Sequence, residues 1–269
     1  MSTLTVVGIA FAVMVMVMTA AWKLQRVTSN GGWVDVVWTL GTGATAALAA
    51  LAPQVGSGGW NVRQAVVAAI VALWSARLGS HIALRVRRSA EDARYQRLRE
   101  AWGAAFQSRM LRFLIAQAAC SAVLIGCVVL AARVPAGGGA RDLLALALAA
   151  SGILGAAIAD AQLARFKADV RNRGGILRSG LWSWSRHPNY FFEWLAWLAL
   201  PALAAGAAGY PVGWLTLAAP AAMYWVLMYA TGVPMLEEHM LRSRGEAYRA
   251  YREQTNAFFP FHRRKVRST

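Results

Sequence analysis

Long apolar runs without charge recur along this chain, and they limit it to one class of fold. Each run is close to the ~20 residues that an α-helix needs to cross the hydrocarbon core of a bilayer. Seven such runs have approximate bounds of 4–22, 33–52, 64–84, 111–132, 143–163, 189–208 and 212–234. We therefore predict an all-α integral membrane protein, a bundle of about seven transmembrane helices.

The composition agrees with this class. Of the 269 residues, 58% are apolar and only 15% are charged, whereas soluble proteins contain about 25% charged residues. No soluble domain or long polar linker interrupts the runs, so we expect a single membrane domain over 1–269, with N-terminal helices in 1–132 and C-terminal helices in 141–262. No basic stretch precedes the first run, which we interpret as a membrane helix and not as a cleaved signal.

The basic residues indicate the orientation of the bundle. With seven crossings, 24 of the 28 Lys and Arg residues fall on one side of the membrane and three on the other. The positive-inside rule then places the N-terminus outside and the C-terminus in the cytoplasm. Because no targeting segment points to an organelle, we expect the bacterial inner membrane as the location.

The formal net charge of +16 is compatible with nucleic acid, anionic lipid or an anionic ligand as partner. The membrane context favours the last two, so we expect membrane lipids and no nucleic acid. Segment 91–106 has aromatic and basic residues at helical spacing, which predicts an amphipathic helix on the cytoplasmic interface. We expect the same of 247–259, followed by a disordered, lipid-facing tail at 262–269.

Five ionisable residues fall inside the predicted spans, where charge is costly and usually functional. They are Asp35, Arg77, His81, Asp160 and Glu193. Each residue alone can be interpreted as an interfacial side chain that snorkels or caps a helix end. All five lie in the cytoplasmic half of the spans, however, and together they indicate a shared polar cavity that opens to the cytoplasm.

The start of the sixth run is suited to anions. Pro188 fits the first position of a helix, so the free N–H groups and the positive end of the helix dipole face the cytoplasm. Six basic residues lie nearby in the sequence, at Arg165, Lys167, Arg171, Arg173, Arg178 and Arg186. A loop that merely holds lipid headgroups is the simpler interpretation. The combination favours a ligand with phosphates outside and a neutral, hydrogen-bonding end inside.

Several enzyme signatures are missing from the sequence. There is no G-x-G-x-x-G after a strand and no G-x-x-x-x-G-K-[ST], so a cofactor is not held by a soluble nucleotide-binding fold. The four histidines have no metal-ligand spacing, so we expect no metal. There is also no G-x-S-x-G motif.

Six stretches carry a family resemblance. They are DVVWTLG (35–41), EDARY (91–95), ADAQLARFK (159–167), GLWSWSRHPNYFFEW (180–194), GVPMLEEHML (232–241) and AYRAYREQTNAFFP (247–260). With them the chain resembles an uncharacterised membrane family, the domain of unknown function 1295, which is grouped with the steroid 5-alpha-reductases through their C-terminal domain. The resemblance implies a seven-helix reductase that holds NADPH among C-terminal helices and cytoplasmic loops, while a lipid-like substrate enters from the bilayer among N-terminal helices.

The resemblance also implies cofactor-binding residues. Asn189 and Glu193 match residues that the reductases place near the nicotinamide, and Asp160 matches an aspartate of the cofactor site. Lys167 falls where the reductases have an arginine, and His239 corresponds to a histidine of their last helix. The full predicted cofactor set is Asp160, Arg165, Lys167, Arg171, Arg178, Arg186, His187, Asn189, Tyr190, Glu193, Glu238, His239 and Tyr248.

The chemistry of these residues agrees with a nicotinamide. Glu193 can accept a hydrogen bond from a carboxamide, and Asn189, one turn earlier, can both donate and accept. The reductases use a glutamate and a tyrosine to polarise the substrate carbonyl, and this chain does not reproduce their spacing. We predict hydride transfer to an electron-poor C=C, with Asp35 first, then His81 and Tyr95, as candidate catalytic acids.

Two other functions remain open. Methyltransferases of the isoprenylcysteine or phospholipid type share a similar C-terminal membrane fold and carry an R-H-P-x-Y-x-G stretch with paired glutamates. Residues 186–190, with Glu237 and Glu238, fit this pattern in part, but Phe192 replaces the glycine. A non-enzymatic lipid-binding or transport protein should have helices broken at mid-membrane in paired halves, and the sequence shows none.

Overall fold

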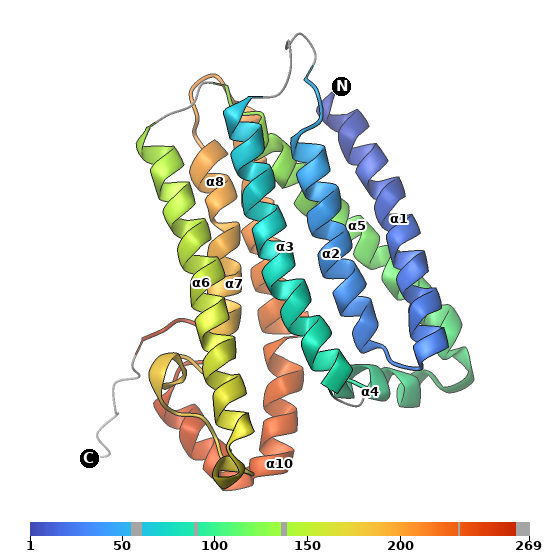
Figure 1. Cartoon of the computed structure of the whole chain (residues 1–269), viewed down its shortest axis with the longest axis vertical. Coiled ribbons are helices and arrows are strands. Elements are labelled where there is room, and N and C mark those ends of the chain that lie inside the picture. The colour runs from blue at the N-terminus through green and yellow to red at the C-terminus, as the bar shows by residue number, and fades with distance from the viewer. Residues whose placement is uncertain (55–60, 89–90, 136–138, 231, 262–269) are drawn as a thin grey trace. The chain divides into compact units, whose positions relative to one another are not determined.

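The computed structural model describes residues 1–54, 61–88, 91–135, 139–230 and 232–261. These residues form α-helices joined by short 3-10 segments, with one π-helical turn and no β-strand among them (Figure 1). The prediction of an all-α protein is therefore confirmed. The predicted tail at 262–269 lies outside the described residues.

Five helical runs in the described part are long and apolar enough to cross a membrane. They are Thr3–Thr28, Val62–Arg88, Arg94–Ala132, Ala140–Ala168 and Pro211–Gln254. Two predicted spans are not among them. The helix at Gly32–Ala50 carries Asp35 and several Gly and Thr residues that lower its hydropathy, and the run at 189–208 is interrupted near Leu198.

The chain divides into two compact units. The first contains Met1–Asp142 and Leu200–Ala219, and the second contains Leu143–Ala199 and Pro220–Thr269. The predicted single membrane domain, with its N-terminal and C-terminal halves, stays a prediction.

The first unit is a bundle in which the long helices lie side by side (Figure 1). Its helices are α1 (Thr3–Thr28), α2 (Gly32–Ala50), α3 (Val62–Arg88), α4 (Ala93–Trp102) and α5 (Phe106–Ala132). The short helix α4 confirms the helix predicted at 91–106 and lies across the lower ends of α2 and α3 in this view. A 3-10 segment, Pro211–Leu217, belongs to the same unit, and the Tyr210 hydroxyl donates to the Leu130 carbonyl of α5 at 3.1 Å.

Buried polar side chains join the helices of this unit. The indole of Trp38 on α2 donates to the Ser121 hydroxyl on α5 at 2.9 Å. Ser75 on α3 donates to the Thr39 carbonyl of α2 at 2.9 Å. Such bonds are typical of membrane bundles, in which small and hydroxyl residues allow helices to approach.

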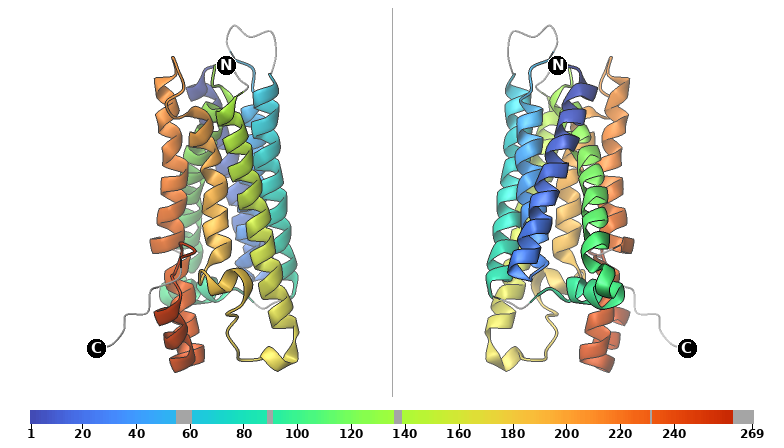
Figure 2. Two further views of the ribbon diagram at one scale, coloured as in Figure 1. Left: turned by 90° about the vertical axis from the view of Figure 1, so that its left-hand side faces the viewer. Right: turned by 90° about the vertical axis from the view of Figure 1, so that its right-hand side faces the viewer.

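The second unit contains most of α6 (Ala140–Ala168), α7 (Pro188–Trp197), most of α9 (Ala218–Trp225), the π-helical turn Val226–Ala230 and α10 (Val233–Gln254). The short helix α8 (Ala199–Ala204) follows α7 across the boundary between the units. Helices α6 and α7 run side by side (Figure 2). At their contact, a Cβ atom on Gly152 would lie 2.5 Å from the backbone nitrogen of Ala196, so only glycine permits this approach.

The segment after α10 is attached to the chain just before α7. The Arg186 amide donates to the Asn256 carbonyl at 2.9 Å, and the Ser185 hydroxyl donates to the Ala257 carbonyl at 3.2 Å. Aromatic rings strengthen the attachment, since the Phe258 ring lies 5.8 Å from that of Trp194 on α7 and 5.2 Å from that of Tyr224 on α9. These contacts fix the entry of the chain into α7.

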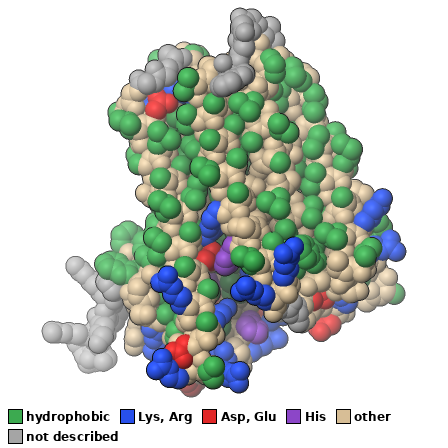
Figure 3. Space-filling view, viewed as in Figure 1, with side chains coloured by type: hydrophobic (Ala, Val, Ile, Leu, Met, Phe, Trp, Pro, Cys, Tyr) green, Lys and Arg blue, Asp and Glu red, His purple; other side chains and the backbone are tan. Residues whose placement is uncertain are grey.

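Charged side chains gather at helix ends in each unit, while hydrophobic side chains cover the exposed faces of α3 and α6 (Figure 3). In the first unit, the last turn of α3 carries Arg85, Arg87 and Arg88. In the second, the last turn of α6 carries Arg165 and Lys167. This distribution is expected where apolar surface faces lipid and the helix ends face water.

Candidate functional site

The second unit brings together three predicted cofactor residues on α6 and α7. The Asn189 amide donates to the carboxylate of Asp160 at 3.1 Å. Glu193 lies one turn further along α7, and both Asp160 and Glu193 are only 7% exposed. Buried carboxylates are retained only where hydrogen bonds or charges stabilise them, so this end of α7 is built around polar contacts.

Local structure explains why these side chains meet. The close contact at Gly152 sets the distance between α6 and α7. The loop before α7 is fixed to the last turns of α6, because the Trp182 indole donates to the Ala159 carbonyl and the Leu181 amide donates to the Gln162 side chain, each at 3.0 Å. Pro188 then begins α7.

A second polar group lies just before α7 and is centred on Glu237 of α10. The guanidinium of Arg186 donates to the Glu237 carboxylate at 2.7 Å and to the Thr255 carbonyl at 2.5 Å. His187 lies 3.3 Å from the same carboxylate oxygen, and Arg252 lies 3.2 Å from the other. This cluster joins three segments that are distant in sequence.

His187 is buried within this group, and its ring stacks on Tyr190 with centroids 5.6 Å apart. Burial lowers the pKa of His187 below its usual range, because the charged ring would lose its hydration, and the nearby Arg186 charge acts in the same direction. The hydrogen bond to Glu237 opposes this shift without reversing it. The imidazole is therefore neutral at pH 7.

The predicted cofactor set includes Glu238 but not Glu237, which the sequence analysis names only as part of the methyltransferase pattern. Glu238 is exposed and pairs with Arg242 one turn along α10 at 2.5 Å, whereas Glu237 is 7% exposed. One signal was available, since Glu237 lies four residues after the apolar Val233 and therefore on the same helix face.

Most of the other predicted cofactor residues are exposed. Arg165, Lys167 and His239 are exposed. Arg171 is exposed and pairs with Asp169 at 2.7 Å. Arg178 donates to the Ala247 carbonyl at 2.5 Å and lies over the ring of Tyr251, next to the buried Tyr248. The structure thus gathers about half of the predicted set near α7, buries Tyr248 on α10, and leaves the others exposed.

In the first unit, two of the three predicted catalytic residues form a pair. The Tyr95 hydroxyl donates to one oxygen of Asp35 at 2.8 Å, and Arg94 donates to the other at 2.5 Å. Gly31 allows this arrangement, because a Cβ atom there would lie 2.3 Å from the Tyr95 ring. His81 lies on α3 and is half-buried.

Asp92 begins α4 and holds this arrangement in place. Its carboxylate accepts from the backbone and the side chain of Arg94 at 3.0 and 3.1 Å. Burial favours the neutral carboxyl, but the hydrogen bonds and charge of Arg94 outweigh it and hold the pKa of Asp92 below its usual range. Among the residues that the structure describes, no group of three or more His, Cys, Asp and Glu side chains is arranged to hold a metal ion.

The fold and these polar groups define an all-α protein with several candidate membrane spans, with buried carboxylates in the second unit and the half-buried Asp35 carboxylate in the first. Residues 21–255 match the family described as "Protein of unknown function (DUF1295)". Because the match covers most of the 269 residues, the chain belongs to this family, and the predicted membership is confirmed.

One relative among curated proteins adds little about activity. A Schizosaccharomyces pombe protein, described only as uncharacterized, is 33% identical over 99 residues, which is 36% of this chain. The match spans 27% of the length of the yeast protein. No solved structure matches this chain.

Proposed function

We propose that this protein is a membrane-embedded reductase that uses NADPH to reduce an electron-poor C=C in a hydrophobic substrate, a steroid-like or lipid enone taken from the bilayer. One observation carries the proposal: the Asn189 amide is hydrogen-bonded to Asp160 at 3.1 Å, with the buried Glu193 one turn further along α7. Amide and carboxylate groups at this spacing are suited to a carboxamide ligand.

The residues present fit the two ends of this cofactor, which supplies a hydride when bound. Glu193 would accept from the carboxamide N–H₂. The bond to Asp160 fixes the donor side of the Asn189 amide, so its oxygen is the side that would accept from the ligand. The exposed cations Arg165, Lys167 and Arg171 would bind the phosphates through charge-assisted hydrogen bonds.

The Asp35–Tyr95 pair in the first unit supports a role in polarising a carbonyl. A tyrosine hydroxyl held by a carboxylate is a positioned hydrogen-bond donor, and such a donor stabilises the negative charge that develops on an enolate oxygen. Because the hydroxyl carries one proton, Tyr95 would turn this proton from Asp35 to the substrate oxygen when the substrate binds, and Asp35 would position the hydroxyl beforehand. His81 remains a third candidate on α3.

We also propose the finer topology. The 19 residues of α2 make a helix about 28 Å long, close to the thickness of the hydrocarbon core. With α2 and the interrupted α7–α8 counted beside the five long runs, the chain crosses the membrane seven times. The basic residues then favour an outside N-terminus and a cytoplasmic C-terminus in a bacterial inner membrane.

A methyltransferase that uses S-adenosylmethionine is the second candidate. One observation favours it: the buried Arg186–Glu237 pair, at 2.6 Å, joins the two stretches that resemble the methyltransferase pattern. Such enzymes need no partner for a nicotinamide, so Asp160, Asn189 and Glu193 would have no role in cofactor recognition.

Cofactor binding tests the proposal. NADPH should stabilise the purified protein against heat and quench its tryptophan fluorescence, whereas S-adenosylmethionine should do neither.

The Glu193→Gln variant should weaken NADPH binding by about tenfold through the lost charged hydrogen bond, and it should leave binding of adenosine 2′,5′-bisphosphate almost unchanged. Stabilisation by S-adenosylmethionine alone would reject the reductase in favour of the methyltransferase. Equal losses for both nucleotides would show that Glu193 is structural.

A further inference from the structure

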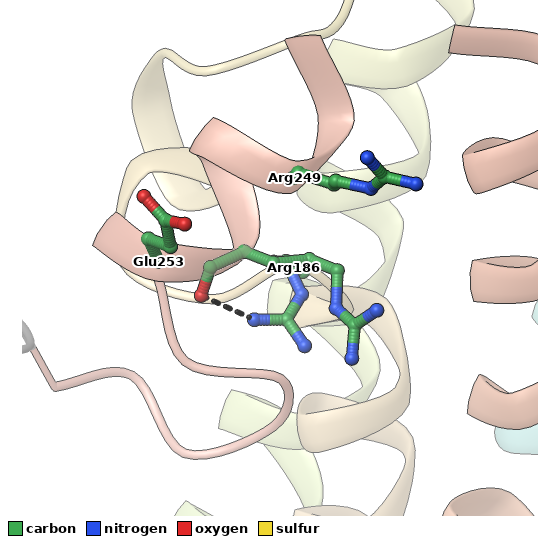
Figure 4. Close-up of a pocket in the computed structure, with 4 residues that line it drawn as sticks. Arg186, Arg249 and Glu253 are labelled. Atoms are coloured by element: carbon green, nitrogen blue, oxygen red, sulfur yellow. Dashed lines mark hydrogen bonds between the residues drawn. The ribbon is translucent and has the colours of Figure 1, made fainter. Parts of the chain in front are cut away.

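The guanidinium groups of this protein differ in how well acceptors match them. In the second unit, Arg186 donates to the Glu237 carboxylate at 2.7 Å and to the Arg252 carbonyl at 3.1 Å, a bond drawn in Figure 4. Arg133, which follows the last turn of α5 in the first unit, is different. Its Nη1 atom donates to the Thr3 hydroxyl at 3.0 Å, but its Nε and Nη2 atoms are buried and have no hydrogen-bond partner among the residues that the structure describes.

The two unpartnered nitrogens of Arg133 form one side of its guanidinium. Their N–H groups point in the same direction, and this is the fork that binds two oxygens of a carboxylate or phosphate at once. A buried donor without an acceptor costs about 1–3 kcal/mol, and more when it is charged. Two such donors on one side of a cation therefore indicate that a group from outside the protein supplies the acceptors.

The charges around Arg133 favour an anion. Arg63 donates to the carbonyl of Val134, next to Arg133, at 3.1 Å, and its Nη2 donates to both oxygens of Asp142 at 2.8 and 2.9 Å. Arg141 donates to the backbone carbonyls at 205 and 206, at 2.7 and 2.8 Å. In the described part of the chain at this end of the first unit, three arginines thus meet one carboxylate, and Arg63 already holds it.

The surroundings of Arg133 are typical of the border of a lipid bilayer. The Tyr210 hydroxyl donates to the Leu130 carbonyl in the last turn of α5. Burial raises the pKa of Tyr210, and the positive charge of the nearby Arg133 opposes this rise. Trp214, in the 3-10 segment after Tyr210, is 58% exposed, and Leu4 at the start of α1 is 85% exposed. Tyrosine and tryptophan are enriched at membrane–water interfaces, where lipid phosphates also lie.

We propose that the Nε and Nη2 atoms of Arg133 bind the phosphate of a phospholipid headgroup. Thr3 would hold the guanidinium in place through the third nitrogen, and the acyl chains would lie along the exposed apolar side chains of α1. Arg133 and Thr3 are half-buried, so the fork lies just below the surface of the bundle, where a headgroup can reach it after a small side-chain movement. This site lies in the first unit and does not depend on the reductase proposal.

The test uses the purified full-length protein in detergent, titrated with dioctanoyl-phosphatidylglycerol while the unfolding temperature is measured. The wild type should be stabilised saturably. Arg133→Gln should weaken lipid binding by about tenfold, because the charged fork is lost. Arg133→Lys keeps the charge but not the fork and should give an intermediate loss. Arg112→Gln, which removes an exposed arginine from the other end of α5, should change binding by less than about twofold.

A second pair of variants keeps the test decisive if the Arg133 variants fold poorly. Thr3→Val removes the acceptor that holds Arg133 and should weaken lipid binding by about threefold. Thr5→Val is its control on the same helix, because the Thr5 hydroxyl bonds the Ser2 hydroxyl at 2.8 Å, and it should leave lipid binding unchanged.

Inorganic phosphate distinguishes a lipid from a free anion. It has no acyl chains and should bind at least about tenfold more weakly than the lipid. Inorganic phosphate that binds as tightly as the lipid, with the same dependence on Arg133, would reject the lipid as the ligand. The site itself is overturned if the lipid does not stabilise saturably, or if Arg133→Gln and Arg112→Gln weaken its binding equally. Glu193→Gln should leave lipid binding unchanged, so a failure of the lipid site and a failure of the reductase proposal are separate results.

Discussion

Glu237 holds the chain segment before α7 in place through its contacts with Arg186 and His187. Its two carboxylate oxygens contact Arg186, His187 and Arg252, and all of the surrounding group except Arg252 is almost fully buried. A buried carboxylate with several cationic or hydrogen-bonding partners becomes costly to remove, because its partners are left uncompensated. The neighbouring Glu238 has the same chemistry on the exposed face of the same helix.

This contrast gives a prediction for stability. Glu237→Gln should lower the free energy of unfolding by roughly 3 kcal/mol, because Arg186 loses its buried counter-charge. Glu238→Gln should lower it by less than about 1 kcal/mol, since its pair with Arg242 is exposed. Denaturant unfolding of both variants in detergent provides the comparison, and similar losses for the two would contradict the assigned role of Glu237.

His187 gives a prediction for pH dependence. The unfolded chain protonates this ring near its ordinary pKa of about 6.5, whereas burial lowers the pKa of His187 in the folded protein. Between the two pKa values the unfolded state binds more protons than the folded state. The contribution of neutral His187 to the free energy of unfolding is therefore complete above about pH 6.5 and is lost as the pH falls. The unfolding temperature of wild type should therefore drop more steeply on acidification than that of His187→Gln. The exposed His239→Gln variant should follow wild type; a His187→Gln slope as steep as that of wild type would refute the explanation.

At the scale of elements, the approach of α6 to α7 positions the Asp160–Asn189 pair. A Cβ atom on Gly152 would clash with the backbone of Ala196. The backbone cannot move aside as a flexible side chain can. The pair itself lies two turns further along α6, so its geometry depends on this approach. Helix contacts of this kind are common in membranes, where small residues allow close packing.

Gly152→Ala should therefore destabilise the protein by about 1–3 kcal/mol through overpacking, and it should also weaken NADPH binding. Gly8→Ala on α1 is the control, because nothing lies within 4 Å of the added carbon, and it should cause no loss of stability. Unfolding in detergent and NADPH titration measure both effects. A Gly152→Ala protein with unchanged stability would show that α6 and α7 tolerate a wider spacing.

At the scale of the whole molecule, the sequence predicts what depends on long local patterns. Helices α1, α3, α5 and α6 were expected from their apolar runs, and each is a few residues longer than its run because polar residues extend it past the apolar part. The interruption near Leu198 was not expected, since composition alone does not distinguish one apolar helix from two shorter ones.

Contacts between distant residues were harder to predict. The Asp35–Tyr95 bond joins residues 60 apart in sequence, and the Arg186–Glu237 bond joins residues 51 apart. Each residue type indicates that a partner is needed, because buried charge is costly, but the choice among several partners depends on tertiary packing. The Asp160–Asn189 pair was anticipated only as two members of a larger set.

The most direct test of the proposed reductase follows the hydride itself. Purified protein is incubated with NADPH in which both hydrogens at the nicotinamide C4 are deuterium, together with an α,β-unsaturated steroid ketone or a neutral-lipid extract, and the lipids are analysed by mass spectrometry. We predict that one deuterium enters a reduced product, that the transfer requires about tenfold more NADPH in Glu193→Gln, and that it is lost in Tyr95→Phe but retained in Glu238→Gln. NADPH that binds without transferring deuterium to any lipid would contradict the proposal.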